Sequence, residues 1–185
     1  MGEVVKLSHA EMLRCWTTAS ERFSIKDPAT NHQVSPRSGR EIHFDGLRLE
    51  VGLCGYIGRP DLVDFNNHLH GDGGVTDFTV NGCRIQAKAS LYEPPYLRFD
   101  KEGKHVFAAD IAVLGFVPLL LNNWQEATKE QRRAWFEANN YVDLVGWITR
   151  DEFFQRAEIM DFGYGERLVV KPPLQPMTTL LRELG

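Results

Sequence analysis

The chain has 185 residues, of which 43% are hydrophobic and 25% charged, and a formal net charge of −4 at neutral pH. A chain of this length buries roughly 70% of its unfolded surface, so we expect one domain over residues 1–185. The composition excludes a disordered or fibrous chain. The negative charge excludes a broad basic face for nucleic acid, so any contact with phosphates must be local.

The cysteines and the apolar runs indicate the compartment. Three cysteines, far apart in the sequence and without a C-x-x-C pair, predict neither a zinc knuckle nor a disulfide framework. The first residues lack the basic and apolar regions of a signal peptide. The longest apolar run, Ile111 to Leu121, is too short to span a bilayer and contains Pro118. We therefore expect a cytoplasmic protein with no membrane contact.

The first third of the chain predicts two helices. An S-x-x-E capping box at residues 8–11 begins a helix that should end near Arg22. Residues 24–43 contain two prolines and several basic side chains, which is typical of a mobile loop. From Asp45, apolar residues recur at helical spacing in a glycine-containing second helix. Glu50 lies beside that apolar stripe.

The rest of the chain alternates predicted strands with helices. We expect strands in the two runs of residues 73–90 and over 96–100, 106–117, 142–149 and 166–172. Capping residues at Thr128 with Gln131 and at Thr149 with Glu152 predict helices over 129–139 and 150–160, and a short helix is expected at the C-terminal end. Several aromatic residues are expected to be core anchors: Trp124, Trp135, Phe136, Trp147, Phe153 and Phe154. Strands interleaved with helices predict an α/β or α+β fold with a mixed central sheet flanked by helices.

The dipeptide Asn-Gly at 81–82 is the strongest short-range signal for a β-hairpin, with a type I′ turn. A two-residue turn there places Asp77 opposite Gln86, and opposite residues share a face of the sheet. Their Cβ atoms should be roughly 5 Å apart, with Lys88 on the diagonal within reach of both. A carboxylate, an amide and an ammonium group therefore converge. The simpler interpretation is a solvated face with a surface ion pair worth at most about 1 kcal/mol.

This pattern resembles the PD-(D/E)xK nuclease superfamily, which has a restriction-endonuclease-like core. Asp77 matches the first acidic position, and Gln86-Ala87-Lys88 matches the (D/E)-x-K tripeptide with Gln in place of the acid. That variant is similar to the Q-x-K of Mrr-type restriction enzymes. Glu50 matches the acidic residue that many members carry on the preceding helix. The resemblance covers about residues 8–115, and the chain also looks like small nucleases of phage and mobile-element genomes.

The resemblance implies hydrolysis of DNA phosphodiester bonds with Mg²⁺ or Mn²⁺ as cofactor. Asp77, the Gln86 side-chain oxygen, the Ala87 carbonyl and Glu50 would be the metal ligands, since Mg²⁺ takes hard oxygen donors. Lys88 would orient the nucleophile or stabilise the developing charge. The neutral amide at Gln86 weakens such a site unless another acid, Glu50 or Asp72, adds charge.

Local contacts with DNA phosphates are expected from four arginines: Arg37, Arg40, Arg48 and Arg84. An acidic chain with one basic patch binds DNA weakly at physiological salt. The expected substrate is therefore a special DNA structure such as a junction or an end, or a second copy of the chain or another protein takes part in binding.

Two other classes of function compete with the nuclease. His70, Asp72 and His105 form an H-x-D…H pattern that could hold non-haem iron, and His68 with His70 could bind zinc. The stronger competitor is a catalytically inactive protein of the same fold that acts as an inhibitor or an assembly factor. Gln86 and the acidic composition favour it, whereas Lys88 favours an enzyme.

Overall fold

The computed structural model describes residues 2–25, 39–66, 76–103, 106–121, 124, 126–163 and 165–185. Its α-helices are α1 (His9–Ile25), α2 (Gly39–Tyr56), α4 (Lys129–Ala138), α5 (Arg150–Arg156) and α6 (Met177–Glu183), and a short 3-10 helix, η2, covers Pro60–Leu62. Its strands are β1 (Glu3–Lys6), β2 (Phe78–Val80), β3 (Cys83–Ser90), β4 (Leu97–Asp100), β5 (Ile111–Phe116), β6 (Tyr141–Thr149), β7 (Glu158–Asp161) and β8 (Glu166–Val170).

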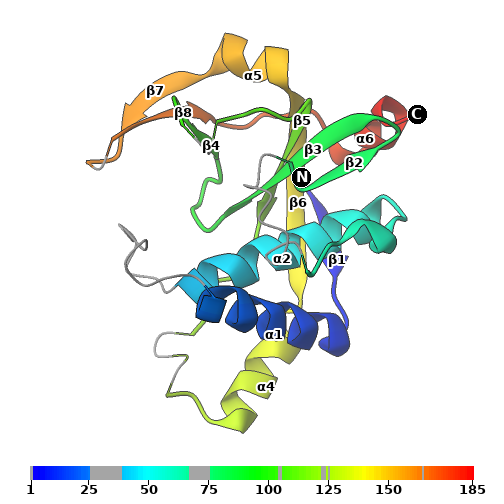
Figure 1. Cartoon of the computed structure of the whole chain (residues 1–185), viewed down its shortest axis with the longest axis vertical. Helices are drawn as coiled ribbons and strands as arrows, with labels where there is room; N and C mark the ends of the chain where they lie inside the picture. Colours follow the sequence, from blue (N-terminus) through cyan, green and yellow to red (C-terminus); the bar gives the residue numbers. More distant parts are fainter. Residues whose placement is uncertain are drawn as a thin grey trace.

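The strands form two sheets (Figure 1). The larger sheet has five strands in the order β1-β6-β5-β3-β2, and the smaller has three in the order β4-β8-β7. Strands β3 and β5 are parallel, and the other neighbours in the large sheet are antiparallel. The predicted α/β class with a mixed central sheet flanked by helices is therefore confirmed.

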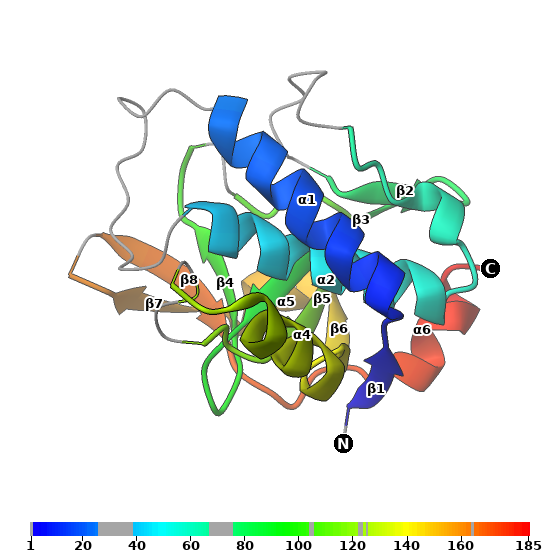
Figure 2. The same ribbon diagram turned by 90° about the horizontal axis from the view of Figure 1, so that it is seen from below.

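Two hydrophobic cores lie on opposite faces of the large sheet. Helices α1 and α2 cover one face, with α4 and α6 at its ends, and the small sheet and α5 lie on the other (Figures 1 and 2). The first core includes Phe44, Leu47, Ile85, Val113 and Val142. The second includes Leu97, Phe99, Phe107, Leu114 and Phe153. Strand β3 therefore has packed layers on both sides.

Helix starts follow their local signals where a capping box is present. The Ser8 amide and hydroxyl both donate to Glu11 at 2.7 Å, and the Glu11 amide donates back to the Ser8 hydroxyl. Thr128 and Gln131 form the same reciprocal pair at the start of α4. The capping boxes predicted for α1 and α4 are confirmed, although α1 runs on to Ile25.

Helix α2 begins at Gly39, six residues before the predicted start and inside the segment assigned to a loop. The reason is tertiary packing. Phe44 is buried and its ring meets Trp16 of α1 edge-on at 5.3 Å, with Phe136 of α4 at 5.9 Å. This aromatic contact stabilises the first turns of α2 more than the local composition suggests.

The prediction of one helix over residues 150–160 is wrong for the second half of that segment. Helix α5 ends at Arg156, and residues 158–161 pair with β8 as strand β7. The Arg156 guanidinium donates to the carbonyl oxygens of Lys171 and Pro173, which fixes the chain after β8 beside the end of α5. Ile159 is consequently 54% exposed on a strand.

The N-terminal strand β1 pairs with β6, and the sequence patterns did not predict it. The four tryptophan and phenylalanine anchors Trp124, Trp135, Phe136 and Trp147 are buried as predicted. Phe153 is buried as well, whereas Phe154 stays exposed. Within the described ranges, none of the helices combines the length and apolarity needed to cross a bilayer.

Candidate active site

The β2-β3 hairpin has the register expected from its Asn-Gly turn. Phe78 pairs with Ile85 and Val80 with Cys83. Asn81 and Gly82 have φ angles of 49° and 85°, as a type I′ turn requires. The register places Asp77 next to the middle of β3, so the hairpin prediction is confirmed.

Asp77 directly precedes β2 and continues the hydrogen bonding to β3 with its amide and its carboxylate. The Asp77 amide donates to the Ile85 carbonyl at 3.0 Å, and the Ala87 amide donates to the Asp77 carboxylate at 2.6 Å. The carboxylate therefore lies beside the strand edge, where a further β2 residue would otherwise pair. It does not stand on one face of the sheet with Gln86 and Lys88, as the simple alternation predicted.

The Ala87 carbonyl lies on the same edge of β3 as Asp77. The carbonyl groups of Arg84 and Ser90 accept hydrogen bonds from amides at the two ends of β5. Because successive carbonyls along a strand point to opposite edges, the Ala87 carbonyl points away from β5. It shares that edge with the Ile85 carbonyl, which accepts from Asp77.

Gln86 is buried, and Lys88 is half-buried beside β4 of the small sheet. Gln86 is 2% exposed, and its side-chain oxygen finds no hydrogen-bond partner among the described residues. The half-buried Lys88 places its ammonium 5.0 Å from the centre of the Phe99 ring on β4. Burial lowers the pKa of Lys88, opposed by the negative charges of Asp77 and Asp100. The simpler interpretation of a solvated face is therefore wrong for Gln86 and Lys88.

Glu50 approaches Asp77 from α2. Burial, and after it the negative charge of Asp77, raise the pKa of Glu50 to about 8. Arg22 opposes this rise and Asp64 adds to it. One turn further along α2, the buried thiol of Cys54 has a pKa raised to about 12 by burial, then by Glu50 and other acids including Asp77. Two carboxylates from separate elements thus share one electrostatic environment.

Arg22 belongs to this environment and was not predicted. It lies in the last turn of α1, where its Nη2 donates to the backbone carbonyl of Asp64 at 3.2 Å. Its Nε is buried and has no hydrogen-bond partner in the described part of the chain. Only the packing of α1 against α2 brings Arg22 near Glu50, so no local signal in the sequence could have revealed it.

The arginines expected to contact DNA differ in their surroundings. Arg37 lies outside the described residues. The Arg40 guanidinium is 5.7 Å from the Trp16 ring centre and 5.6 Å from that of Phe23. The Arg84 guanidinium donates two hydrogen bonds to Asp110 and, together with the Arg84 amide, lowers the pKa of that carboxyl to about 2.

The expectation for Arg48 is corrected. Arg48 is fully buried in the first core, where it donates to Asp45 at 2.6 Å and to the Pro118 carbonyl at 2.7 Å. Its guanidinium also lies over the ring of Phe44. A buried charge of this kind needs such partners, and it cannot reach a phosphate at the surface.

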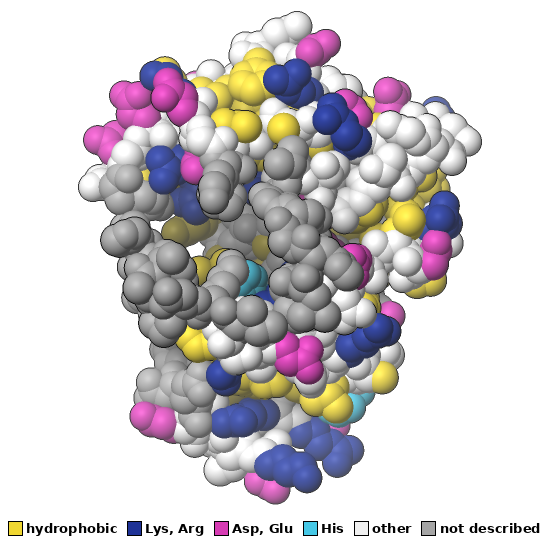
Figure 3. All heavy atoms as spheres, viewed as in Figure 1, with side chains coloured by type: hydrophobic (Ala, Val, Ile, Leu, Met, Phe, Trp, Pro, Cys, Tyr) yellow, Lys and Arg dark blue, Asp and Glu magenta, His cyan; other side chains and the backbone are white. Residues whose placement is uncertain are grey.

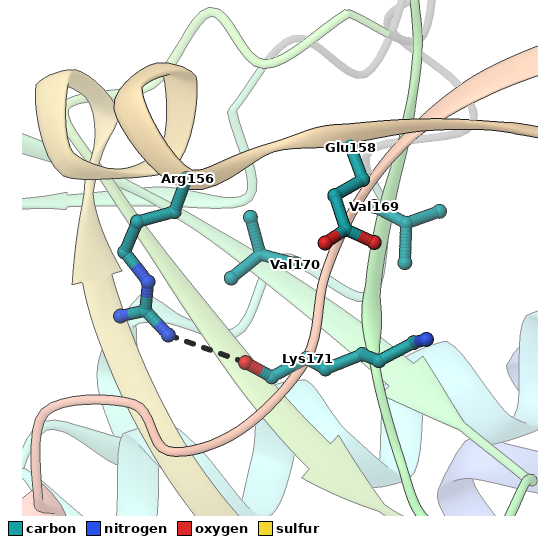
Figure 4. A pocket seen from close by; sticks show the side chains of 5 residues that line it. All are labelled: Arg156, Glu158, Val169, Val170 and Lys171. Carbon is teal, nitrogen blue, oxygen red and sulfur yellow. Dashed lines mark hydrogen bonds between the residues drawn. The ribbon is translucent and has the colours of Figure 1, made fainter.

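The surface carries its charge in mixed groups. On the face shown in Figure 3, Lys and Arg side chains gather over α4 and near α5, with Asp and Glu side chains among them. Two hollows in the described structure lie over the small sheet, away from Asp77. One is lined by Arg156, Glu158, Val169, Val170 and Lys171 (Figure 4). The other is lined by Asp100, Lys101, Glu102, Glu166 and Arg167.

Metal donors at the candidate site are oxygen atoms only. No group of three or more His, Cys, Asp or Glu side chains within the described ranges could hold a metal ion. What the site offers is two carboxylates, the buried Gln86 amide oxygen and the Ala87 carbonyl. The residues of the iron and zinc alternatives, His68, His70, Asp72 and His105, lie outside the described residues.

Comparison with protein-family models, with curated proteins and with solved structures gives no match to this chain. A fold class alone does not assign an activity. Function therefore rests on the chemistry of the site residues.

Proposed function

We propose that this chain is a metal-dependent nuclease that hydrolyses DNA phosphodiester bonds at the Asp77 edge of β3. The observation that carries the proposal is the proximity of Glu50 to Asp77, whose charge adds to burial in raising the pKa of Glu50 to about 8. A poorly solvated Glu50 beside the negative charge of Asp77 is unfavourable as a carboxylate unless a cation neutralises the pair. Carboxylates in such a pair are typical of sites that do chemistry.

The donor set fits a hard divalent cation, Mg²⁺ or Mn²⁺. Asp77, Glu50, the Gln86 side-chain oxygen and the Ala87 carbonyl would hold it, because such ions take oxygen ligands and retain several waters. The Gln86 oxygen supports this fit, since a buried acceptor without a partner costs roughly 1–3 kcal/mol. When bound, the cation lowers the pKa of water and offsets negative charge on the scissile phosphate.

Lys88 contributes a positive charge and hydrogen-bond donors, which the acidic residues lack. Its charge interacts with that of Asp77, and burial lowers its pKa. A lysine of lowered pKa exchanges protons more readily near neutral pH than an exposed one. Lys88 would orient the attacking water and donate hydrogen bonds to the phosphate oxygens as negative charge grows there. Asp77 keeps the ammonium close to the reacting group by its opposite charge.

The test compares the wild-type chain with Lys88→Met and Asp77→Asn on linear, nicked and branched DNA, with Mg²⁺, with Mn²⁺ and with chelator. Met keeps the length of Lys88 without its charge, and Asn keeps the shape of Asp77. We expect cation-dependent cleavage by the wild type and a loss of about 100-fold or more in both variants. Lys129→Met, a change at an exposed lysine of α4, is the matched control and should cleave normally.

Equal cleavage by the wild type and by both site variants would remove the assigned active site. If the wild type cleaves none of the substrates, the second candidate is favoured. That candidate is an inactive protein of the same fold that binds DNA or another protein. The specific observation in favour of that candidate is the neutral Gln86, which leaves two acids where three acidic ligands could stand.

A further inference from the structure

Three aromatic rings and a guanidinium form a continuous stack between two chain connections. Tyr92 stacks on Tyr96 with ring centroids 5.3 Å apart and planes at 17°. Tyr96 lies 6.1 Å from Phe162, and Arg98 Cζ lies 5.3 Å from the Phe162 ring centre. We call these four residues the aromatic ladder. It joins the β3-β4 connection and β4 to the connection between β7 and β8.

The aromatic ladder is not part of either hydrophobic core. The cores contain other rings, such as Phe99 and Phe107. Tyr92, at the outer end of the ladder, is a large aromatic ring and is 58% exposed. A stacked aromatic ring kept at the surface offers a flat binding surface to a flat ligand.

The aromatic ladder begins where the candidate active site ends. Tyr92 follows Lys88 by four residues, and its amide donates to the Ser90 hydroxyl at the end of β3. At the other end of the ladder, Arg98 precedes Phe99 on β4, and the Lys88 ammonium lies 5.0 Å from the centre of the Phe99 ring. A DNA strand with a phosphate at Lys88 would therefore have its neighbouring nucleotides at the ladder.

We propose that the aromatic ladder binds unpaired bases of single-stranded DNA by stacking on Tyr92. In a duplex both faces of each base are covered by neighbouring pairs, so only an unpaired base can stack on a protein ring. This inference rests on the proposed function for the position of the scissile phosphate. It names the substrate class as single strands, flaps or frayed ends.

Base stacking, rather than phosphate attraction, dominates this binding. Besides the positive Arg98, this surface carries the negative charge of the exposed Glu93, which is next to Tyr92 in the chain. A surface of balanced charge gains little from counterion release. Binding should therefore require the bases themselves.

The test measures fluorescence anisotropy with labelled oligothymidylate, a duplex of equal length and an abasic strand of equal length, all with chelator so that nothing is cleaved. We expect the wild type to bind oligothymidylate more tightly than either comparison probe. Tyr92→Ala should weaken that binding about tenfold. Tyr92→Phe should retain it, because the ring remains. Phe154→Ala, which removes an exposed ring on α5, is the control and should bind as the wild type does.

Three results would overturn the inference: no binding of oligothymidylate by the wild type, equal binding of the abasic strand, or normal binding by Tyr92→Ala. Failure of the nuclease proposal has a different signature. Tyr92-dependent binding in a chain that cleaves nothing would support the aromatic ladder and remove the active site. Lys88-dependent cleavage with Tyr92-independent binding would do the reverse.

Discussion

At the scale of single residues, the surroundings of Glu50 favour its protonated form. Ionisation of Glu50 at high pH therefore lowers the free energy of unfolding. Its pKa rises from 4.5 to about 8, so the folded chain binds a proton that the unfolded chain has already lost between these values. The free energy of unfolding must therefore fall as pH rises through this window. A bound cation would offset this loss of stability, because it would favour the ionised form of Glu50.

Glu50→Gln should remove this pH dependence. At about pH 8 the variant should be more stable than the wild type by about 1–2 kcal/mol, less than the pKa shift alone would give because water reaches the half-buried carboxylate. Near pH 5 the two should be alike. Urea unfolding with chelator at both pH values measures the difference, and Mg²⁺ at the higher pH should stabilise the wild type. Glu130→Gln on the exposed side of α4 is the control, and parallel profiles for wild type and Glu50→Gln would contradict the prediction.

How much of the site the sequence predicts depends on how local its geometry is. Asp77, Gln86 and Lys88 belong to one hairpin, and a two-residue turn fixes their register. The carboxylate of Asp77 leaves the expected face because β2 begins only at Phe78, which no local pattern marks. Arg22 comes from another helix, so the hairpin pattern does not include it. Arg48 and Asp45 are three residues apart, and this spacing is the same for a buried ion pair as for a surface one.

At the scale of elements, the β2-β3 turn is fastened to the last residues of the chain. The Asn81 side-chain amide donates to the Leu184 carbonyl at 2.8 Å, and Asn81 itself has positive φ. The turn conformation sets the register that brings Asp77 to Ala87. Stability of this one turn therefore bears directly on the geometry of the candidate site.

Two substitutions at Asn81 should separate these contributions. Asn81→Ala loses the amide and strains the positive φ, so it should lower the free energy of unfolding by about 1–2 kcal/mol. Asn81→Gly also loses the amide but tolerates positive φ, so its loss should be roughly half as large. Chemical denaturation of both variants gives the comparison. A glycine variant less stable than the alanine variant would show that the conformation of the turn is not what Asn81 secures.

Elements were predicted well where one signal dominates and poorly where packing competes with it. Capping boxes located α1 and α4, and alternation located β3 and β6. The start of α2 is set by the aromatic contact of Phe44, which is a tertiary effect. Residues 158–161 follow a helix-like pattern but pair with β8, because a strand partner outweighs a weak local preference.

At the scale of the whole molecule, charge limits how the chain can hold DNA. The net charge is −4, and many arginines already have acidic partners. Exposed or half-buried examples are Arg59 with Asp61, Arg84 with Asp110, Arg133 with Glu137 and Arg156 with Glu152. Long-range attraction is therefore weak, and recognition depends on short-range contacts near Lys88 and Tyr92.

Binding of single-stranded DNA should consequently depend little on salt. If about two or three phosphates are neutralised, the plot of log affinity against log salt has a slope of roughly −1.5 to −2, since each contact on a single strand adds about −0.7. Anisotropy titrations of oligothymidylate between about 50 and 200 mM salt measure this slope. Arg84→Ala should leave it unchanged, because Asp110 already neutralises that guanidinium. A slope steeper than about −5 would instead indicate a basic groove that grips the backbone, and the aromatic ladder would then be secondary to it.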